Sequence, residues 1–523
     1  MQIPLGRLRG HARSPWWRGA AALLAGALPA LSFPAPSLWW LAYFALVPWM
    51  LLMRAAPTPR RAALDGWLGG TAFMIAVHHW LLPSLNVFIV VLAALLGTLW
   101  APWGWLVRSM LGRTATASRV AAALVVVPSG WLMVEQVRSW QGLGGPWGLL
   151  GSSQWQVGPA LRLASVGGVW LVSLLVVAVN TAVVALLVAE SARTTAATGA
   201  VACAVVTGAV SWWAPRPAEE GSTRVAVVQP GVVKGVDARF DRSEALTREL
   251  AGRDVDLVVW GESSVGRDLT SRPRLTARIA ALSRLTGADI LVNVDARRSD
   301  RPGIYKSSVL VGPSGLTGDR YDKMRLVPFG EYVPARSVLG WATSVGKAAG
   351  EDRKRGTRQV VMTLPGGLRV GPMVCFESAF PDMSRQLTRD GTRLLVAQSA
   401  TSSFQHSWAP EQHASLGALR AAETGRPMVH ATLTGVSAVY GPDGRRVGPW
   451  LGTGSSTSEV YDIPLADGTT LYVRFGDWPL RGALAVLAVL AAVEGLRSFR
   501  RPAARPTAPH ARTAHESAGH PGR

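Results

Sequence analysis

Long runs of apolar residues fill the first 215 residues of the chain and return once near its C-terminus. A helix needs about 20 predominantly apolar residues to cross a bilayer. The runs predict a membrane domain over residues 19–215 with about seven spans, and one further transmembrane helix over residues 478–497. The seven spans are expected at residues 19–33, 38–53, 64–82, 87–107, 121–133, 157–188 and 197–214.

The part between these runs, residues 222–477, has short apolar segments that alternate with polar, helix-forming segments. Short Val-rich runs predict buried strands, whereas longer amphipathic segments predict helices. About 250 residues of this kind fit one α/β or α+β domain. Strands are expected at residues 224–229, 255–260, 290–294, 305–311, 368–374, 394–398 and 436–440, and helices at residues 242–252, at 275–285 and from Pro381 onward.

The net charge of +21 taken alone would suggest a nucleic-acid-binding protein. Arginines, however, cluster between the apolar runs and form no continuous basic face, which excludes that class. The clusters lie at residues 7–18, 54–61, 108–119, 193 and 497–505. Because such clusters mark cytoplasmic loops, the pattern predicts a cytoplasmic N-terminus (1–18), a disordered cytoplasmic tail (498–523) and an extracytoplasmic middle domain. The first run resembles a signal peptide, but a second run follows within a few residues, which argues against cleavage.

Candidate chemistry centres on one thiol. The chain has two cysteines, which excludes a disulfide scaffold, and Cys203 lies inside the seventh apolar run. Cys375 is the only thiol of the middle domain and follows a predicted strand. A lone cysteine is more often a buried packing residue than a nucleophile, and a nucleophile needs a base or a cation nearby. Glu262, at another strand end, and Lys323, followed by Glu331, are candidates, although each also fits a helix-cap neighbour or a solvated loop charge.

Three of these segments, in this order, resemble the nitrilase superfamily: WGES at residues 260–263, YDK with LVPFGEYVP within residues 321–334, and CFES at residues 375–378. The apolar runs on both sides narrow the resemblance to the apolipoprotein N-acyltransferase family. Further segments support it across the whole chain except the tail. These are GGPWGLLGSSQ (144–154), RAAETGRP (420–427) and RFGDWP (474–479).

The resemblance implies a fold and a reaction. The fold would be an αββα nitrilase-like sandwich carried by a membrane domain of about eight helices, in a bacterial inner membrane. The enzyme would move an acyl chain from a phospholipid, typically phosphatidylethanolamine, to the α-amino group of the N-terminal diacylglyceryl cysteine of apolipoproteins. The reaction would be ping-pong, through a thioester on the enzyme, without cofactor or metal. His406 and His413 have no cysteine or acid at zinc-ligand spacing. A glycosyltransferase partner is a further hypothesis that the sequence leaves open.

The resemblance also implies roles for individual residues. Cys375 would be the nucleophile, Glu262 the general base, and Lys323 the oxyanion-stabilising cation, assisted by the backbone N–H of Phe376. Glu331 would orient Lys323 or help to transfer protons. Glu377 would have a structural or substrate-positioning role, and Trp147 and Trp408 are candidates for substrate binding.

Two segments depart from the family pattern. Where the family has an Asn-Asp-Ala-Trp stretch, this chain has Ser-Ala-Thr-Ser-Ser at residues 399–403, and residues 232–240 lack a tryptophan that the family often has. Both segments are expected to face substrate. Two alternatives therefore remain beside the acyltransferase. One is a membrane-bound nitrilase-type amidase, and the other is a catalytically degenerate scaffold that binds lipoproteins.

Overall fold

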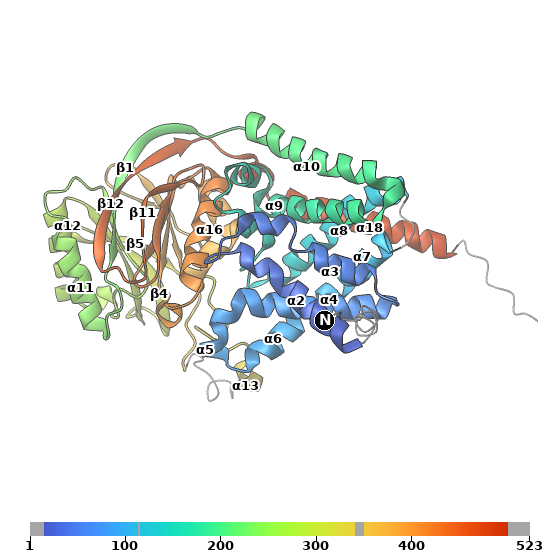
Figure 1. Ribbon diagram of the computed structural model, residues 1–523. Coiled ribbons are helices and arrows are strands. Elements are labelled where there is room, and N and C mark those ends of the chain that lie inside the picture. Colours follow the sequence, from blue (N-terminus) through green and yellow to red (C-terminus); the bar gives the residue numbers. More distant parts are fainter. Residues whose placement is uncertain (1–14, 113–115, 340–349, 500–523) are drawn as a thin grey trace, which may run out of the picture.

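The computed structural model describes residues 15–112, 116–339 and 350–499, so most of the predicted cytoplasmic N-terminus and tail lie outside it. The chain forms a helical part and a part built on two β-sheets, which lie side by side (Figure 1). Both parts of the predicted fold, a helical membrane domain and an αββα sandwich, are thereby confirmed.

All eight predicted spans contain helix. Within the described residues, five helical segments are long and apolar enough to cross a membrane: Phe88–Leu111, Ala117–Arg138, Gly158–Val188, Glu190–Trp213 and Trp478–Arg497. The other three runs form shorter or less apolar helices. The helices of this part are α2 (Pro15–Ala27), α3 (Val47–Arg54), α4 (Pro59–His78), α5 (Leu82–Leu85), α6 (Phe88–Gly97), α7 (Trp100–Leu111), α8 (Ala117–Arg138), α9 (Gly158–Val188), α10 (Arg193–Trp213) and α18 (Trp478–Phe499).

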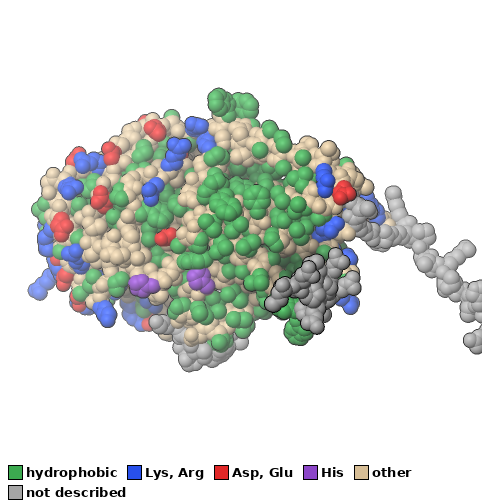
Figure 2. All heavy atoms as spheres, in the orientation of Figure 1, with side chains coloured by type: hydrophobic (Ala, Val, Ile, Leu, Met, Phe, Trp, Pro, Cys, Tyr) green, Lys and Arg blue, Asp and Glu red, His purple; other side chains and the backbone are tan. Residues whose placement is uncertain are grey.

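Aromatic rings fill the centre of the helical part. Trp49, Trp100, Trp103 and Trp131 are fully buried, with ring centroids 5.0–6.2 Å apart in edge-on contacts. The outside is apolar too: Figure 2 shows a broad hydrophobic surface over the helices, with charged side chains gathered over the β-sheet part and at the opposite end. A helix bundle that is apolar both inside and outside is typical of a protein whose solvent is lipid.

The part built on β-sheets, here called the outer domain because it lies outside the helical bundle, contains two six-stranded mixed sheets. The first has the order β12-β1-β2-β3-β4-β5 and the second β11-β10-β9-β8-β7-β6. The strands of the first sheet are β1 (Ala218–Gln229), β2 (Leu257–Trp260), β3 (Asp289–Arg297), β4 (Ile304–Gly312), β5 (Gly315–Asp322) and β12 (Thr457–Asp467). Those of the second are β6 (Met362–Thr363), β7 (Arg369–Val374), β8 (Leu394–Ser399), β9 (Met428–Thr432), β10 (Ser437–Tyr440) and β11 (Arg446–Leu451).

Alternating side chains build the layers of this domain. On β1, Val225 and Val227 face the second sheet, whereas Ala226 and Val228 face helices α11 (Val236–Arg248) and α12 (Pro273–Thr286). The second sheet is covered by α15 (Pro381–Arg389) and α16 (Ala409–Thr424). The same hydrophobic core continues into the helical part, so α16 lies between the sheet and the membrane domain.

Helix α9 is broken where it meets α16. Gly167 and Gly168 leave the helical conformation, and Gly168 has a φ of +68°, which only glycine adopts without strain. The break frees the backbone N–H of Val169, which donates to Glu423 of α16 (2.8 Å). Glu423 also pairs with Arg420, whose guanidinium donates to the carbonyl of Ala379 (2.7 Å). This chain of contacts connects a membrane helix with the turn that follows β7.

Orientation in the membrane is testable with single cysteines in a chain that lacks its own (Cys203→Ala, Cys375→Ala). The sites are Ser314, exposed between β4 and β5, and Ser191, exposed between α9 and α10. In right-side-out vesicles, a membrane-impermeant maleimide should label the Ser314→Cys chain and should label Ser191→Cys only after permeabilisation. The reverse labelling would show that the arginine clusters lie outside the cytoplasm.

Candidate active site

The nucleophile candidate sits in a strained turn. Strand β7 ends at Val374, and Cys375 begins a short 3-10 helix (Cys375–Ala379) with a φ of +51°, a left-handed conformation that is uncommon for a non-glycine residue. The turn is fixed from α16. His413 Nε2 lies 3.0 Å from the carbonyl oxygen of Cys375, and His413 Nδ1 lies 3.1 Å from Ser399 Oγ. A neutral imidazole satisfies both contacts by donating at Nε2 and accepting at Nδ1. Strain that is held in this way is a frequent property of reactive residues.

Glu262 reaches the site because the two sheets approach closely at the end of β2. A Cβ atom on Gly261 would lie 1.9 Å from the backbone nitrogen of Leu433, so this position of the WGES segment requires glycine. The backbone N–H of Glu262 donates to the carbonyl of Ser399 (3.0 Å) in the facing sheet. Ser263 N donates to Asn293 Oδ1 (2.9 Å), which fixes the turn. The carboxylate is thereby held in a buried position.

Two lysines and two glutamates form a buried ion cluster beside Cys375. Lys323 Nζ lies 2.8 Å from Glu331 Oε1 and 3.3 Å from Glu262 Oε1. Lys306 Nζ, from β4, lies 2.7 Å from the same Glu262 oxygen and 2.9 Å from Glu331. Each ammonium therefore bridges both carboxylates. Lys323 is completely buried, whereas 14% of the Lys306 side chain is exposed.

The four groups of the ion cluster are charged, and the thiol of Cys375 is protonated. Burial raises the pKa of Cys375 to about 12, the charge of Glu262 acting in the same direction and that of Lys323 opposing it. The pKa of Glu331 is lowered to about 2, because the charges of Lys323 and Lys306 outweigh the opposing effect of burial. For Glu262, Lys306 and Lys323 likewise outweigh burial and lower its pKa. The resting site therefore has two ammonium groups, two carboxylates and a neutral thiol, which needs a base to become a nucleophile.

Glu377 has four hydrogen-bond donors around its carboxylate. Oε1 accepts from Tyr321 Oη (2.7 Å) and from the backbone N–H groups of Met324 (2.7 Å) and Arg325 (3.0 Å). Oε2 accepts from the N–H of Val374 (2.8 Å). This fully buried side chain joins the segment that carries Lys323 to the turn that carries Cys375.

The structure brings Glu262, Lys323, Glu331, Phe376 and Glu377 together around Cys375, and it shows two neighbours that sequence reasoning missed. Lys306 had a visible signal, since it is one of five lysines in the chain and interrupts an apolar strand. His413 was considered only as a zinc ligand. Its contacts form only once α16 packs against segments that are distant in the sequence, and the residues next to His413 give no sign of them. Within the described residues, no group of three or more His, Cys, Asp or Glu side chains could hold a metal ion.

The two tryptophan candidates lie at the junction with the membrane helices. Trp147 is buried, donates from Nε1 to Gln412 (2.9 Å) and packs its ring 5.1 Å from that of His413. The ring of Trp408 stacks edge-on at 4.6 Å against His79. Just before Trp147, a Cβ on Gly145 would lie 2.6 Å from the Phe376 ring, so this loop of the membrane domain covers the nucleophile turn closely.

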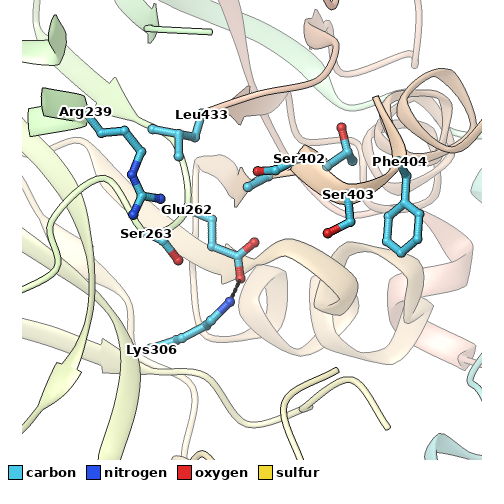
Figure 3. A pocket seen from close by; sticks show the side chains of 10 residues that line it. Arg239, Glu262, Ser263, Lys306, Ser402, Ser403, Phe404 and Leu433 are labelled. Atoms are coloured by element: carbon cyan, nitrogen blue, oxygen red, sulfur yellow. Dashed lines mark hydrogen bonds and ion pairs between the residues drawn. The ribbon is translucent and has the colours of Figure 1, made fainter. Parts of the chain in front are cut away.

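Two openings in the protein surface lead toward the buried ion cluster and the Cys375 turn. A cavity of about 190 Å³ is lined by Glu262 and Lys306, together with Arg239 of α11 and residues 400–404 (Figure 3). The two segments that were expected to face substrate, 232–240 and 399–403, thus both contribute residues to one cavity. A larger open cleft of about 1040 Å³ runs from the C-terminal end of α8 to Met324 and Phe380, and its wall includes Trp140 and Trp170.

A neutral His413 predicts a specific acid sensitivity. Burial lowers its pKa to about 4, and burial likewise lowers that of His430, whose ring lies 4.7 Å away. Because histidine in the unfolded chain titrates near 6.5, the stability that His413 contributes is complete above pH 6.5 and is lost as the pH falls toward 4, by about 3 kcal/mol. Thermal unfolding in detergent between pH 7 and pH 4 should show this loss.

The matched variants are His413→Gln, which should reduce the pH dependence, and His406→Gln on the exposed loop, which should keep it. An undiminished pH dependence in His413→Gln would mean that His413 is not the titrating group.

Two family profiles match the chain. The N-terminal domain of apolipoprotein N-acyltransferase matches residues 25–182, and the carbon-nitrogen hydrolase family matches residues 224–470. Among curated proteins, the apolipoprotein N-acyltransferase of Geobacter metallireducens is 31% identical over 500 residues, covering 90% of this chain and 94% of its own. That of Azotobacter vinelandii is 31% identical over 509 residues, covering 92% and 95%.

Solved structures of the CN-hydrolase superfamily match about half of the chain. A CN-hydrolase superfamily protein from Xanthomonas campestris is 18% identical, covering 51% of this chain and 97% of its own, with a TM-score of 0.37. An amidase from Nesterenkonia sp. is also 18% identical, covering 49% and 94%, with a TM-score of 0.33. The full-length relatives match both the membrane part and the outer domain with about 30% identity, and the chain therefore belongs to the apolipoprotein N-acyltransferase family.

Proposed function

We propose that this protein transfers an acyl chain from a phospholipid to the α-amino group of a diacylglyceryl-modified cysteine at the N-terminus of a lipoprotein. The observation that carries the proposal is the thiol of Cys375, held in a strained turn beside a buried Glu–Lys cluster and covered by a loop of the membrane domain. A hydrolase that acts on soluble substrates does not need an active site in contact with membrane helices. A site for two lipid-anchored substrates requires such contact.

In the first half-reaction, Glu262 takes the proton from Cys375 Sγ, and the thiolate attacks the ester carbonyl of the phospholipid. Lys323 stabilises the oxyanion, together with the backbone N–H of Phe376. Lys323 has three N–H donors, of which Glu262 and Glu331 occupy two. The C–O bond then breaks, and the departing alkoxide of the lysophospholipid receives the proton from Glu262. The acyl chain remains on Cys375 as a thioester.

In the second half-reaction, the amine of the lipoprotein attacks the thioester. Only the neutral amine is nucleophilic, so Glu262 takes up the proton that the attacking nitrogen loses. Collapse of the tetrahedral intermediate expels the Cys375 thiolate, which recovers its proton from Glu262. Glu331 holds Lys323 in place throughout, because it contributes the shorter of that lysine's two ion pairs. Water must be kept out during this interval, since it would hydrolyse the thioester.

The membrane orientation belongs to the proposal. Both termini lie in the cytoplasm, and the outer domain faces the opposite side, where the mature N-termini of exported lipoproteins are found. Phospholipid then reaches the site from the outer surface of the membrane.

Cys375→Ala should abolish the reaction. The variant cannot form the thioester, so N-acylation of a diacylated lipopeptide should fall by about 10⁴-fold or more, and no hydroxylamine-sensitive acyl adduct should form. Product is measured by mass spectrometry after incubation with phospholipid. Cys203→Ala is the matched control, because Cys203 lies within α10 and should leave both adduct and product at wild-type levels.

Product formation by Cys375→Ala at the wild-type rate would contradict the proposed mechanism. If the wild-type protein releases its acyl group as free fatty acid in the presence of the lipopeptide, the protein is a hydrolase of the nitrilase type. If it forms neither adduct nor product with any phospholipid, it is a binding scaffold.

A further inference from the structure

The smaller cavity combines positive charge with hydroxyl groups. Arg239 enters it from α11 and Lys306 from β4, and the exposed residues Ser402 and Ser403 face them across the opening, with Glu262 between (Figure 3). The cavity therefore contains the catalytic base of the proposed reaction at one wall and hydrogen-bond donors at the others.

Of the two cations that line this cavity, Lys306 is paired with Glu262, Glu331 and, at 3.9 Å, Asp295, whereas Arg239 lacks a counterion in the part of the chain that the structure describes. Glu262 is the only acidic residue that lines it, and this carboxylate already pairs with Lys306 and Lys323. Arg239 has no carboxylate within ion-pair distance among the described residues. Its Nε donates instead to the carbonyl of Gly235 in its own helical turn (3.2 Å). A cation that faces a cavity without a counterion, beside hydroxyl groups, is suited to an anion with several oxygens.

The cavity also lies next to the membrane helices. Phe404, which lines it, packs its ring 4.9 Å from that of Trp80, at the outer end of α4. A lipid ligand can thus extend its apolar part toward the helices while its polar part occupies the cavity. In a glycerophospholipid, only a few bonds separate the phosphate from the ester carbonyls. A phosphate held here would place an ester close to Glu262 and the Cys375 turn.

We propose that Arg239, Lys306 and the hydroxyl groups of Ser402 and Ser403 form the subsite for the phosphate of the phospholipid acyl donor. This inference rests on the proposed function and specifies how the donor is recognised. Three of its four residues come from the segments 232–240 and 399–403, which are expected to face substrate.

Lys306 would then bind two anions in turn, first the carboxylate of Glu262 and then the phosphate of the donor. Its ammonium lies 2.7 Å from Glu262 in the empty site, and a phosphate oxygen would compete for the same donor. Binding of the donor would weaken the hold of Lys306 on Glu262, and the carboxylate would become a better base when substrate is present. The other charged or titratable groups that act on Glu262 are Lys323, Glu331, Cys375 and His413, and none of them lines this cavity.

Arg239→Gln tests the subsite, with Arg242→Gln as the matched control. Arg242 lies one helical turn further along α11, is half-buried with its guanidinium bonded to Ser456, and does not line the cavity. Two donors with the same acyl chains are compared in mixed micelles: phosphatidylglycerol, and diacylglycerol, which has no phosphate. Arg239→Gln should lower kcat/KM for phosphatidylglycerol by about 10- to 100-fold and leave diacylglycerol within about twofold, because only the phosphate contact is lost. Arg242→Gln should change neither.

Inorganic phosphate supplies a second readout. It should inhibit the wild-type protein competitively against phosphatidylglycerol, and inhibit Arg239→Gln less. The inference is overturned if Arg239→Gln affects both donors equally, if it affects neither, or if the wild type uses both donors with equal kcat/KM. Inhibition by inorganic phosphate with unchanged phosphatidylglycerol turnover in Arg239→Gln would show a free-phosphate site and also overturn it. A wild-type protein that acylates the lipopeptide from neither donor would refute the proposed function itself.

Discussion

The fully buried ion pair between Arg420 and Glu423 joins the two halves of this protein. Glu423 caps the backbone N–H that the break in α9 exposes, and Arg420 binds the carbonyl of Ala379 at the end of the nucleophile turn. Removing one member of a buried pair typically costs 3–5 kcal/mol, since the other charge is left without a partner. The outer domain therefore cannot shift against the membrane helices without first breaking these bonds. The position of Cys375 relative to the membrane helices thus depends in part on hydrogen bonds that run from α16 to α9 and to the turn after β7.

In the candidate active site, the buried charges form a four-membered cluster and not a single ion pair. The charges of its two lysines and two glutamates balance one another, so their burial is tolerated. The thiol is neutral chiefly because burial raises its pKa, and the charge of Glu262 adds to this effect. In the proposed mechanism, reactivity therefore comes from a change in the surroundings of Glu262 when substrate enters, and not from a permanently ionised nucleophile. Such an arrangement protects a membrane enzyme against acylation or oxidation of its thiol while it is idle.

Much of this structure could be predicted from the sequence. Apolar runs located all eight helical regions, and the strands before Glu262 and Cys375 were found because Val-rich segments are locally distinctive. The shared location of Glu262, Lys323, Glu331 and Cys375 came from resemblance, because their order along the chain says nothing about their distances. Strands β5, β6, β9, β11 and β12 were missed, because they are short or lack a clear alternating or Val-rich pattern, and their pairing is decided by neighbouring strands in the sheets. Lys306 was overlooked because its partners lie on other strands, and His413 because its role exists only once α16 is packed.

Both ends of the outer domain are attached to the membrane over a very short distance. Strand β1 begins four residues after α10 ends, and α18 follows the short helix α17 (Leu471–Phe475) almost directly. Four extended residues span at most about 14 Å, so the height of the site above the bilayer is nearly constant. Substrates anchored in the same membrane consequently search for the site by lateral diffusion in two dimensions. The rate of encounter is then governed by the number of substrate molecules per unit area of membrane, a quantity that dilution of the surrounding solution leaves unchanged.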